Sequence, residues 1–119
     1  MNKKIIYWTV TVIVSALMIF SGIAYFTIPE VVEGFSKMGF QDYFRVELAI
    51  AKLIGAVVLL LPMIPKIVRE WTFAGFAITF VSAFIAHLSM GDPLSVSIFP
   101  IIVLALLAVS QRYYYKLYN

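Results

Sequence analysis

The sequence predicts an all-α fold, an integral membrane four-helix bundle with a short interfacial helix between the first and second spans. Hydrophobic residues make up 63% of the 119 residues and charged residues 13%, against about 45–50% and about 25% in ordinary soluble domains. A chain this short cannot bury such an excess, because small domains keep much of their surface in contact with solvent. Four apolar stretches, separated by short polar connections, supply the spans. We expect a single transmembrane domain over residues 1–119.

The spans follow from the length of each apolar stretch, since a hydrocarbon layer of about 30 Å takes about 20 helical residues. The first stretch is longer than a signal-peptide core and is followed by three more, so we interpret it as a retained span. The second ends before Pro62 and Pro65, and Pro100 should bend the fourth. The predicted spans are residues 5–26, 43–61, 71–89 and 94–111.

The connection after the first span, "TIPEVVEGFSKMG", predicts a short amphipathic helix over residues 28–38. Thr27 precedes Glu30 by three residues, which is the spacing of a capping box, and Pro29 falls in the first turn, where its missing N–H costs nothing. Gly39 can end the helix. We expect this helix to lie on the outer membrane face. Its apolar side consists of Val31, Val32, Phe35 and Met38.

The basic residues predict the orientation of the chain. If four spans alternate, six Lys and Arg residues flank one side, and only Lys37 and Arg45 lie in the connection opposite. Positive charge favours the cytoplasmic side. We therefore predict a multi-pass protein of the cytoplasmic membrane with both termini in the cytoplasm. The six residues are Lys3, Lys4, Lys66, Arg69, Arg112 and Lys116.

Helical spacing assigns a face to each span. Small residues let helices approach closely in lipid, so stripes of small residues are expected inside the bundle. On the first span the stripe is Thr11, Ser15, Met18, Gly22 and Tyr25. On the third span it is Thr72, Gly75, Thr79, Ser82, Ala86 and Ser89. On the second span the expected inward face is Glu47, Ala51, Lys52, Gly55 and Ala56, which leaves Ile50, Leu53, Ile54, Val57 and Leu61 for lipid.

The candidate functional site is a polar layer near the outer end of the bundle. Glu47 and Lys52 lie in the outer half of the second span, His87 reaches a similar depth on the third, and Tyr25 ends the first. Ionisable groups inside a membrane are costly and usually functional. We predict that Glu47 and Lys52 face the interior, that His87 pairs with Glu47, and that the layer binds a small ligand.

Each member of this layer also has a structural interpretation. Tyr25 can be an interfacial anchor, and Lys52 can extend its ammonium to the outer headgroups. Glu47 can form an ion pair, so that the layer only fixes helix register. The "MGDP" turn is interpreted as structural. In it Gly91 ends the third span, Asp92 is the N-cap of the fourth and Pro93 starts it.

Composition also excludes several classes of activity. Without cysteine, thiolate catalysis, iron–sulfur ligation and cysteine–zinc sites are excluded. One histidine with these neighbours makes no familiar metal site, and no nucleophile–base pair is visible, so we assign no catalytic residue and expect no independent enzymatic activity. The basic residues form no patch of interleaved aromatics for nucleic acid.

The segments "FSGIAYFTIPEVVEGFSKMGF", "YFRVELAIAKLIGAVVLLLP" and "EWTFAGFAITFVSAFIAHLSMGDP" resemble the DoxX-like family of small bacterial four-helix membrane proteins. The resemblance covers nearly the whole chain. Its most specific parts are the helix with Glu47 and Lys52 and the turn with His87, Gly91, Asp92 and Pro93. The family name derives from a membrane subunit associated with thiosulfate:quinone oxidoreductase, which implies a link to quinone chemistry or oxidative stress.

Three functions remain open on these grounds. The first is a binding or accessory subunit for a quinone or another lipophilic molecule, in a homo-oligomer or beside a redox-enzyme partner; a quinone is the one cofactor considered. The second is a small proton-coupled transporter with Glu47 as the proton carrier. The third is a structural or assembly subunit whose polar layer fixes helix packing.

Overall fold

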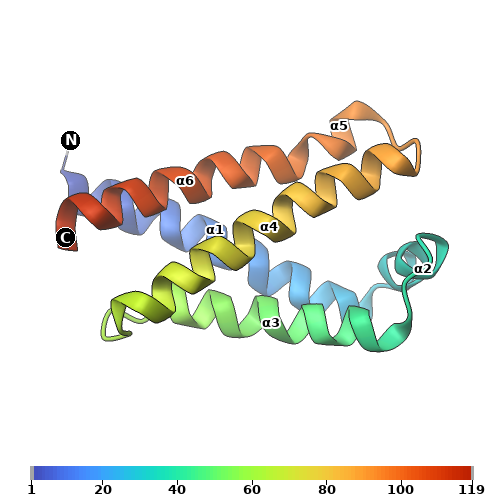
Figure 1. The fold of residues 1–119 in the computed structure, drawn as a ribbon, viewed down its shortest axis with the longest axis horizontal. Coiled ribbons are helices and arrows are strands. Elements are labelled where there is room, and N and C mark those ends of the chain that lie inside the picture. Colours follow the sequence, from blue (N-terminus) through green and yellow to red (C-terminus); the bar gives the residue numbers. More distant parts are fainter. Residues whose placement is uncertain (1, 119) are drawn as a thin grey trace.

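The computed structural model describes residues 2–118, which form six helices joined by short connections, with no strand in this range (Figure 1). The all-α prediction is confirmed. Four helices are long and two, α2 and α5, are short. The helices are α1 Lys3–Thr27, α2 Pro29–Lys37, α3 Asp42–Leu60, α4 Lys66–Ser89, α5 Leu94–Ser97 and α6 Phe99–Tyr118.

The long helices run back and forth along the longest dimension of the molecule. Both chain ends and the α3–α4 connection lie at one end, and α2 and the α4–α5 connection lie at the other (Figure 1). We call these the terminal end and the distal end. Helix α1 packs against α3 and α6, and α4 packs against α6 and α3. The chain ends therefore share one end of the molecule, as alternating helices require.

Three helical stretches within residues 2–118 are long and apolar enough to cross a membrane, judged by length and composition: Lys3–Thr27, Lys66–Ser89 and Leu94–Tyr118. Helix α3, with 19 residues, carries Arg45, Glu47 and Lys52, and its crossing stays a prediction. The last stretch is broken at Ile98 between α5 and α6. Pro100 lies just after this break and has no N–H to donate to the preceding turn, which agrees with the expected bend.

The inward face of α1 follows the predicted stripe closely, that of α3 follows it only at Lys52, Gly55 and Ala56, and that of α4 does not follow it. Thr11, Ser15, Met18 and Gly22 are buried on α1, and the Thr11 and Ser110 hydroxyls join α1 to α6 at 2.7 Å. On α4 the buried side chains are Arg69, Phe73, Phe76 and Phe80, whereas Gly75, Ser82 and Ser89 are exposed and Thr72, Thr79 and Ala86 are half-buried. The predicted inward stripe of small residues on α4 is therefore wrong.

The packing of α3 explains why aromatic side chains face inward on α4. A Cβ atom added to Gly55 would lie 2.5 Å from the Phe76 ring, and one added to Gly22 would lie 2.9 Å from Leu53. The glycines on α1 and α3 leave the space that the rings and branched side chains of the facing helix fill. Close approach of two helices needs a small residue on only one of them. Since α3 supplies the glycine at this contact, α4 can supply the large ring.

Two turns at the distal end close on glycine. Gly39 has φ +89° and Gly91 has φ +74°, the left-handed region that residues with a Cβ rarely adopt. The Gly91 N–H bonds to the Leu88 carbonyl and the Asp92 N–H to the His87 carbonyl, which is a Schellman motif. The predicted roles of both glycines as helix ends are confirmed.

Two predicted N-caps are wrong. Thr27 is the last residue of α1, and its hydroxyl donates to the Ile23 carbonyl. Asp92 stands one residue too early, because Pro93 is the N-cap residue of α5. Both side chains instead bond to the preceding helix, whose last turn is closer to them than the helix that follows.

Candidate functional site

The central residue of the candidate site is Lys52, whose side chain is only 7% exposed. Its ammonium donates to the Ser21 hydroxyl at 2.8 Å and to the Tyr25 hydroxyl at 2.6 Å, both on α1. Within residues 2–118 no carboxylate lies within salt-bridge distance of Lys52. An ammonium has three donors, so one remains after these two bonds. The predicted inward orientation of Lys52 is confirmed.

Tyr25 joins three helices at this site. The Lys52 ammonium lies 4.3 Å from the centre of its ring. The ring also meets Phe35 of α2 edge-on, with ring centres 4.7 Å apart. Arg45 of α3 donates to the Tyr25 carbonyl, beyond which α1 ends, and lies 3.6 Å from Asp42. The side chain of Tyr25 is therefore contacted by Lys52 of α3 and Phe35 of α2, and its carbonyl by Arg45 of α3.

Glu47 does not belong to this cluster. Its side chain is exposed on the outer surface of α3, so the predicted inward orientation is wrong. Glu47 and the fully buried Ala56 are nine residues apart, which at about 100° per residue places them on opposite sides of the helix. Ala51, assigned to the same inward arc, is exposed as well. Ile50, Ile54, Val57 and Leu61 are exposed as predicted. Leu53, which was also expected to face lipid, is half-buried and lies against Gly22 of α1, so that prediction is wrong.

His87 has a different partner from the one predicted. Its Nδ1 lies 2.7 Å from a carboxylate oxygen of Asp92, and both side chains are about one third exposed. The Schellman turn brings Asp92 back over the last turn of α4, so the closest carboxylate to His87 is the local one. The predicted Glu47–His87 pair is wrong. His87, Gly91 and Asp92 form the turn itself, and Pro93 leads into α5.

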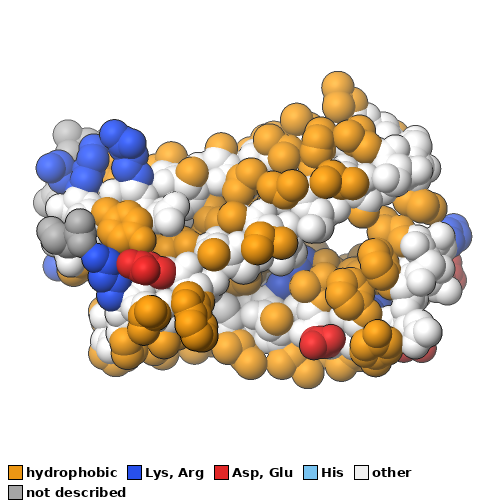
Figure 2. Space-filling view, viewed as in Figure 1, with side chains coloured by type: hydrophobic (Ala, Val, Ile, Leu, Met, Phe, Trp, Pro, Cys, Tyr) orange, Lys and Arg blue, Asp and Glu red, His pale blue; other side chains and the backbone are white. Residues whose placement is uncertain are grey.

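A groove lies between α4 and the α2–α3 connection. It has a volume of about 340 Å³ and is lined mainly by apolar side chains. In Figure 2 the surface is open between the distal half of α4 and the α2–α3 end, and Lys or Arg atoms are visible next to the opening. The lining residues are Met38, Phe40, Ser82, Ile85, Ala86, Ser89 and Met90.

Sequence reasoning missed two polar residues. Ser21 bonds to Lys52 and stands four residues before Tyr25, on the same face of α1, which is a signal that helical spacing provides. Arg69 is 1% exposed although its position at the start of an apolar stretch is typical of a surface anchor. Its partners include backbone carbonyls, which no sequence pattern identifies.

The Lys52 cluster has the properties of a binding site for a polar group in an apolar setting. A buried ammonium with a spare donor and two hydroxyls can hold a carbonyl or an anionic oxygen. The exposed apolar side chains on every long helix can accommodate a lipophilic body, and apolar surface with a few polar groups is the usual composition of a small-molecule site. The groove beside α4 is lined by neither Lys52 nor its partners.

An all-helical chain with three stretches apolar enough to cross a bilayer, and apolar side chains over its outer surface, is an integral membrane protein. The sequence profile of the DoxX-like family matches residues 9–110. The chain therefore belongs to the DoxX-like family, which confirms the resemblance seen in the sequence. No curated protein and no solved structure gave a significant match.

Proposed function

We propose that this DoxX-like protein binds a quinone or a similar lipophilic molecule within the cytoplasmic membrane and serves as a binding or accessory subunit in membrane redox processes. The observation that carries the proposal is the Lys52 ammonium, which is buried against neutral hydroxyls without a carboxylate. An unpaired charge at mid-membrane costs about 2.5–3.5 kcal/mol even on the lenient insertion scale. A buried lysine with a cost of that size is expected to be retained because it binds a ligand.

Quinone carbonyls fit this chemistry better than a cation or a sugar does. A carbonyl oxygen accepts hydrogen bonds, and Lys52 and Tyr25 provide donors close to the α2 side of the bundle. The quinone ring can stack on aromatic side chains, and its prenyl tail would extend along the lipid-facing surface. The protein supplies binding and orientation, and electron transfer would occur to a partner subunit.

The test is to identify what copurifies with the protein. Wild-type protein from membranes that contain quinone is solubilised gently and examined by native mass spectrometry and by solvent extraction with chromatography. We expect a bound lipophilic molecule, its loss in Lys52→Met, and its retention in Lys37→Met, which removes an exposed cation. Wild-type protein without such a molecule would contradict the proposal.

A second candidate is an assembly subunit, and the position of Glu47 favours it. The carboxylate is exposed on α3 among lipid-facing aliphatic side chains such as Ile50 and Ile54, where a basic group from another chain would pair with it. The transporter alternative loses support, because its proton carrier lies outside the interior. If Glu47→Gln abolished copurification of a partner chain while the bound lipophilic molecule was kept, the assembly role would stand beside the binding role.

The proposed topology has four spans, with α3 as the second. Its first turns carry Asp42 and Arg45, which are suited to a headgroup region, and the remaining turns are apolar except for the inward Lys52 and the exposed Glu47. With α3 included, the terminal end faces the cytoplasm, and α2 lies on the outer surface. Its half-buried Val31, Val32 and Phe35 would then face the membrane and the bundle.

A further inference from the structure

Arg69 is a second buried cation. It lies at the terminal end, on α4, whereas Lys52 lies on α3. It lies in the first turns of α4 and is 1% exposed. Its Nη1 donates to the Tyr7 hydroxyl at 3.2 Å and to the Leu59 carbonyl at 2.9 Å, and its Nη2 donates to the Leu61 carbonyl. Within residues 2–118 no carboxylate lies within salt-bridge distance of Arg69. The positive charge is therefore balanced by dipoles and by the ring of Tyr114, whose centre lies 5.2 Å from the guanidinium carbon.

The two carbonyls explain part of this arrangement. They belong to the last turn of α3 and its C-cap, where backbone oxygens lack partners within their own helix and carry partial negative charge. A guanidinium has five N–H donors, and the three bonds to Tyr7, Leu59 and Leu61 use three of them. Two donors remain, one on Nη2 and one on Nε, and Nε is buried without any hydrogen-bond partner.

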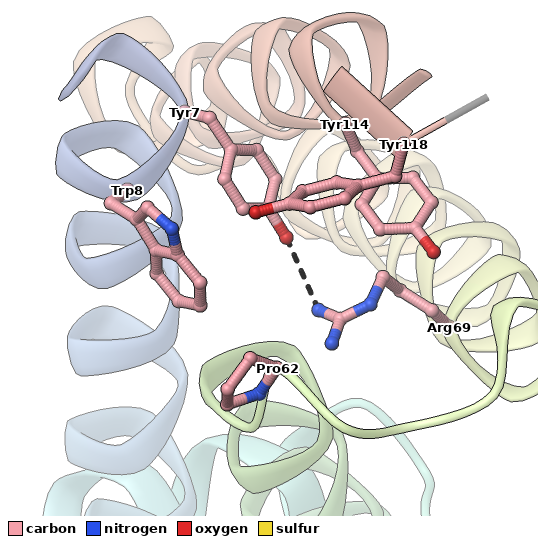
Figure 3. Close-up of a pocket in the computed structure, with 6 residues that line it drawn as sticks. All are labelled: Tyr7, Trp8, Pro62, Arg69, Tyr114 and Tyr118. Atoms are coloured by element: carbon pink, nitrogen blue, oxygen red, sulfur yellow. Dashed lines mark hydrogen bonds between the residues drawn. The ribbon is translucent and has the colours of Figure 1, made fainter. Parts of the chain in front are cut away.

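A cavity of about 70 Å³ adjoins the guanidinium, lined by Tyr7, Trp8, Pro62, Arg69, Tyr114 and Tyr118. Figure 3 shows the guanidinium directed into the space between Tyr7, Pro62 and the rings of α6, with the Tyr118 oxygen close to that of Tyr7. The cavity is larger than the roughly 30 Å³ that one water occupies in the liquid. Since Tyr118 is 51% exposed, the cavity is reached from the surface.

The charge in the lining of the cavity has one sign. The lining contains one cation, several phenols and an indole, but no acidic residue. The sequence places Lys3, Lys4, Arg112 and Lys116 at the same end. Glu70, the acidic residue next to Arg69 in sequence, does not line the cavity. An unpaired guanidinium, hydroxyl donors and surrounding positive charge are the features that select an oxyanion.

We infer that this cavity binds a phosphate group, held by the Arg69 guanidinium and the phenol hydroxyls of Tyr7 and Tyr118. Phosphate matches arginine because its oxygens accept the forked N–H donors of the guanidinium. The group can belong to a phospholipid whose acyl chains lie along the outer surface, or it can be free in solution. The Lys52 site plays no part in this inference.

The experiment measures thermal unfolding of the full-length protein in a phosphate-free detergent. One arm compares inorganic phosphate with chloride at equal ionic strength. The other compares mixed micelles that contain phosphatidic acid with micelles that contain diacylglycerol of the same acyl chains. We expect phosphate to raise the melting temperature of the wild type in at least one arm. A rise in the lipid arm alone identifies a headgroup site, and a rise in both identifies a general phosphate site.

Matched variants separate binding from general electrostatics. Arg69→Gln should weaken the affinity for phosphate about tenfold or more, seen as a higher phosphate concentration needed for the same rise in melting temperature. Arg112→Gln, which removes an exposed cation at the same end, should leave this concentration unchanged. If Arg69→Gln does not fold, Tyr118→Phe removes a cavity hydroxyl from a half-exposed ring and should reduce the effect. The inference is overturned if neither arm stabilises the wild type, or if the folded cavity variants respond to phosphate as the wild type does.

Discussion

Lys52 and Arg69 illustrate how a small membrane protein holds buried positive charge. Each cation donates to neutral oxygens and keeps at least one unused donor, with hydroxyls as acceptors for Lys52 and mainly carbonyls for Arg69. Neutral acceptors return only part of the lost hydration energy. Arg69 also closes a helix end, which gives it a structural role. Lys52 closes no helix end, and its retention is better explained by a ligand.

Replacing Lys52 with methionine tests this difference. Met has a similar length and volume and removes the buried charge, so we expect Lys52→Met to be as stable as the wild type or up to about 1–4 kcal/mol more stable. The free energy of unfolding in detergent, measured with a denaturant series, checks this. Lys37→Met is the control. A marked loss of stability in Lys52→Met alone would assign the lysine to packing.

At the residue scale, the sequence predicts inward orientation where small neighbours define an arc. The inward orientation of Lys52 is predicted correctly because Gly55 and Ala56 lie next to it on the helix. The predicted arc is too broad to be one face when it includes Glu47, because helical geometry sets Glu47 opposite Ala56. The sequence assigns Arg69 only to the basic residues that flank the membrane, because hydropathy does not reveal that its partners are the carbonyls of another helix.

At the scale of elements, helices pack here by placing rings against glycines. Phe76 of α4 lies over Gly55 of α3, and Leu53 of α3 lies over Gly22 of α1. Gly75, by contrast, has open space around it. The contrast between these positions provides a direct test of the packing.

Gly55→Ala should destabilise the protein by about 1–3 kcal/mol, because the added methyl group would lie 2.5 Å from the buried Phe76 ring and force a shift. Gly75→Ala should be neutral or stabilising by up to about 1 kcal/mol, since alanine has the higher helix propensity. Thermal unfolding of both variants under identical conditions is the measurement. Equal effects of the two substitutions would contradict the contact between Gly55 and Phe76.

The turn at the distal end of α4 depends on the backbone of Gly91. Alanine at φ +74° brings its Cβ close to the carbonyl oxygen, so Gly91→Ala should cost about 1–2 kcal/mol. Gly34→Ala, at a helical position with open space, is the control and should not destabilise. Chemical unfolding midpoints compare the two, and a Gly91→Ala variant as stable as Gly34→Ala would contradict the role of the turn.

At the scale of the whole molecule, the helices agree with the predicted order but not with every boundary. Hydropathy predicts all four long helices, because each of them contains one of the four apolar stretches. It placed the start of α4 at 71 rather than Lys66, and the end of α6 at 111 rather than Tyr118. Helices continue past the apolar stretch as long as backbone bonding allows, and hydropathy does not record this.

The proposed topology rests on the shared end of the two termini and on the distribution of basic residues. The protein has no cysteine, so single introduced cysteines report their own accessibility. We expect Lys37→Cys to react with an impermeant maleimide from outside intact cells, and Asn2→Cys to react only after the membrane is opened. Arg112→Cys should behave like Asn2→Cys. Reaction of Asn2→Cys from outside would reverse the orientation, and different behaviour of Asn2→Cys and Arg112→Cys would exclude an even number of spans.

The bonds between Arg69 and the end of α3 have a consequence for biosynthesis. At the α2 and α4 ends, the turns through Gly39 and Gly91 bond their carbonyls with neighbouring backbone. The Leu59 and Leu61 carbonyls instead accept from Arg69, which emerges from the ribosome after them. In the proposed four-span topology, the last turn of α3 therefore lacks these partners until α4 is synthesised. We expect α3 and α4 to insert together as a hairpin, whereas α1 can enter alone.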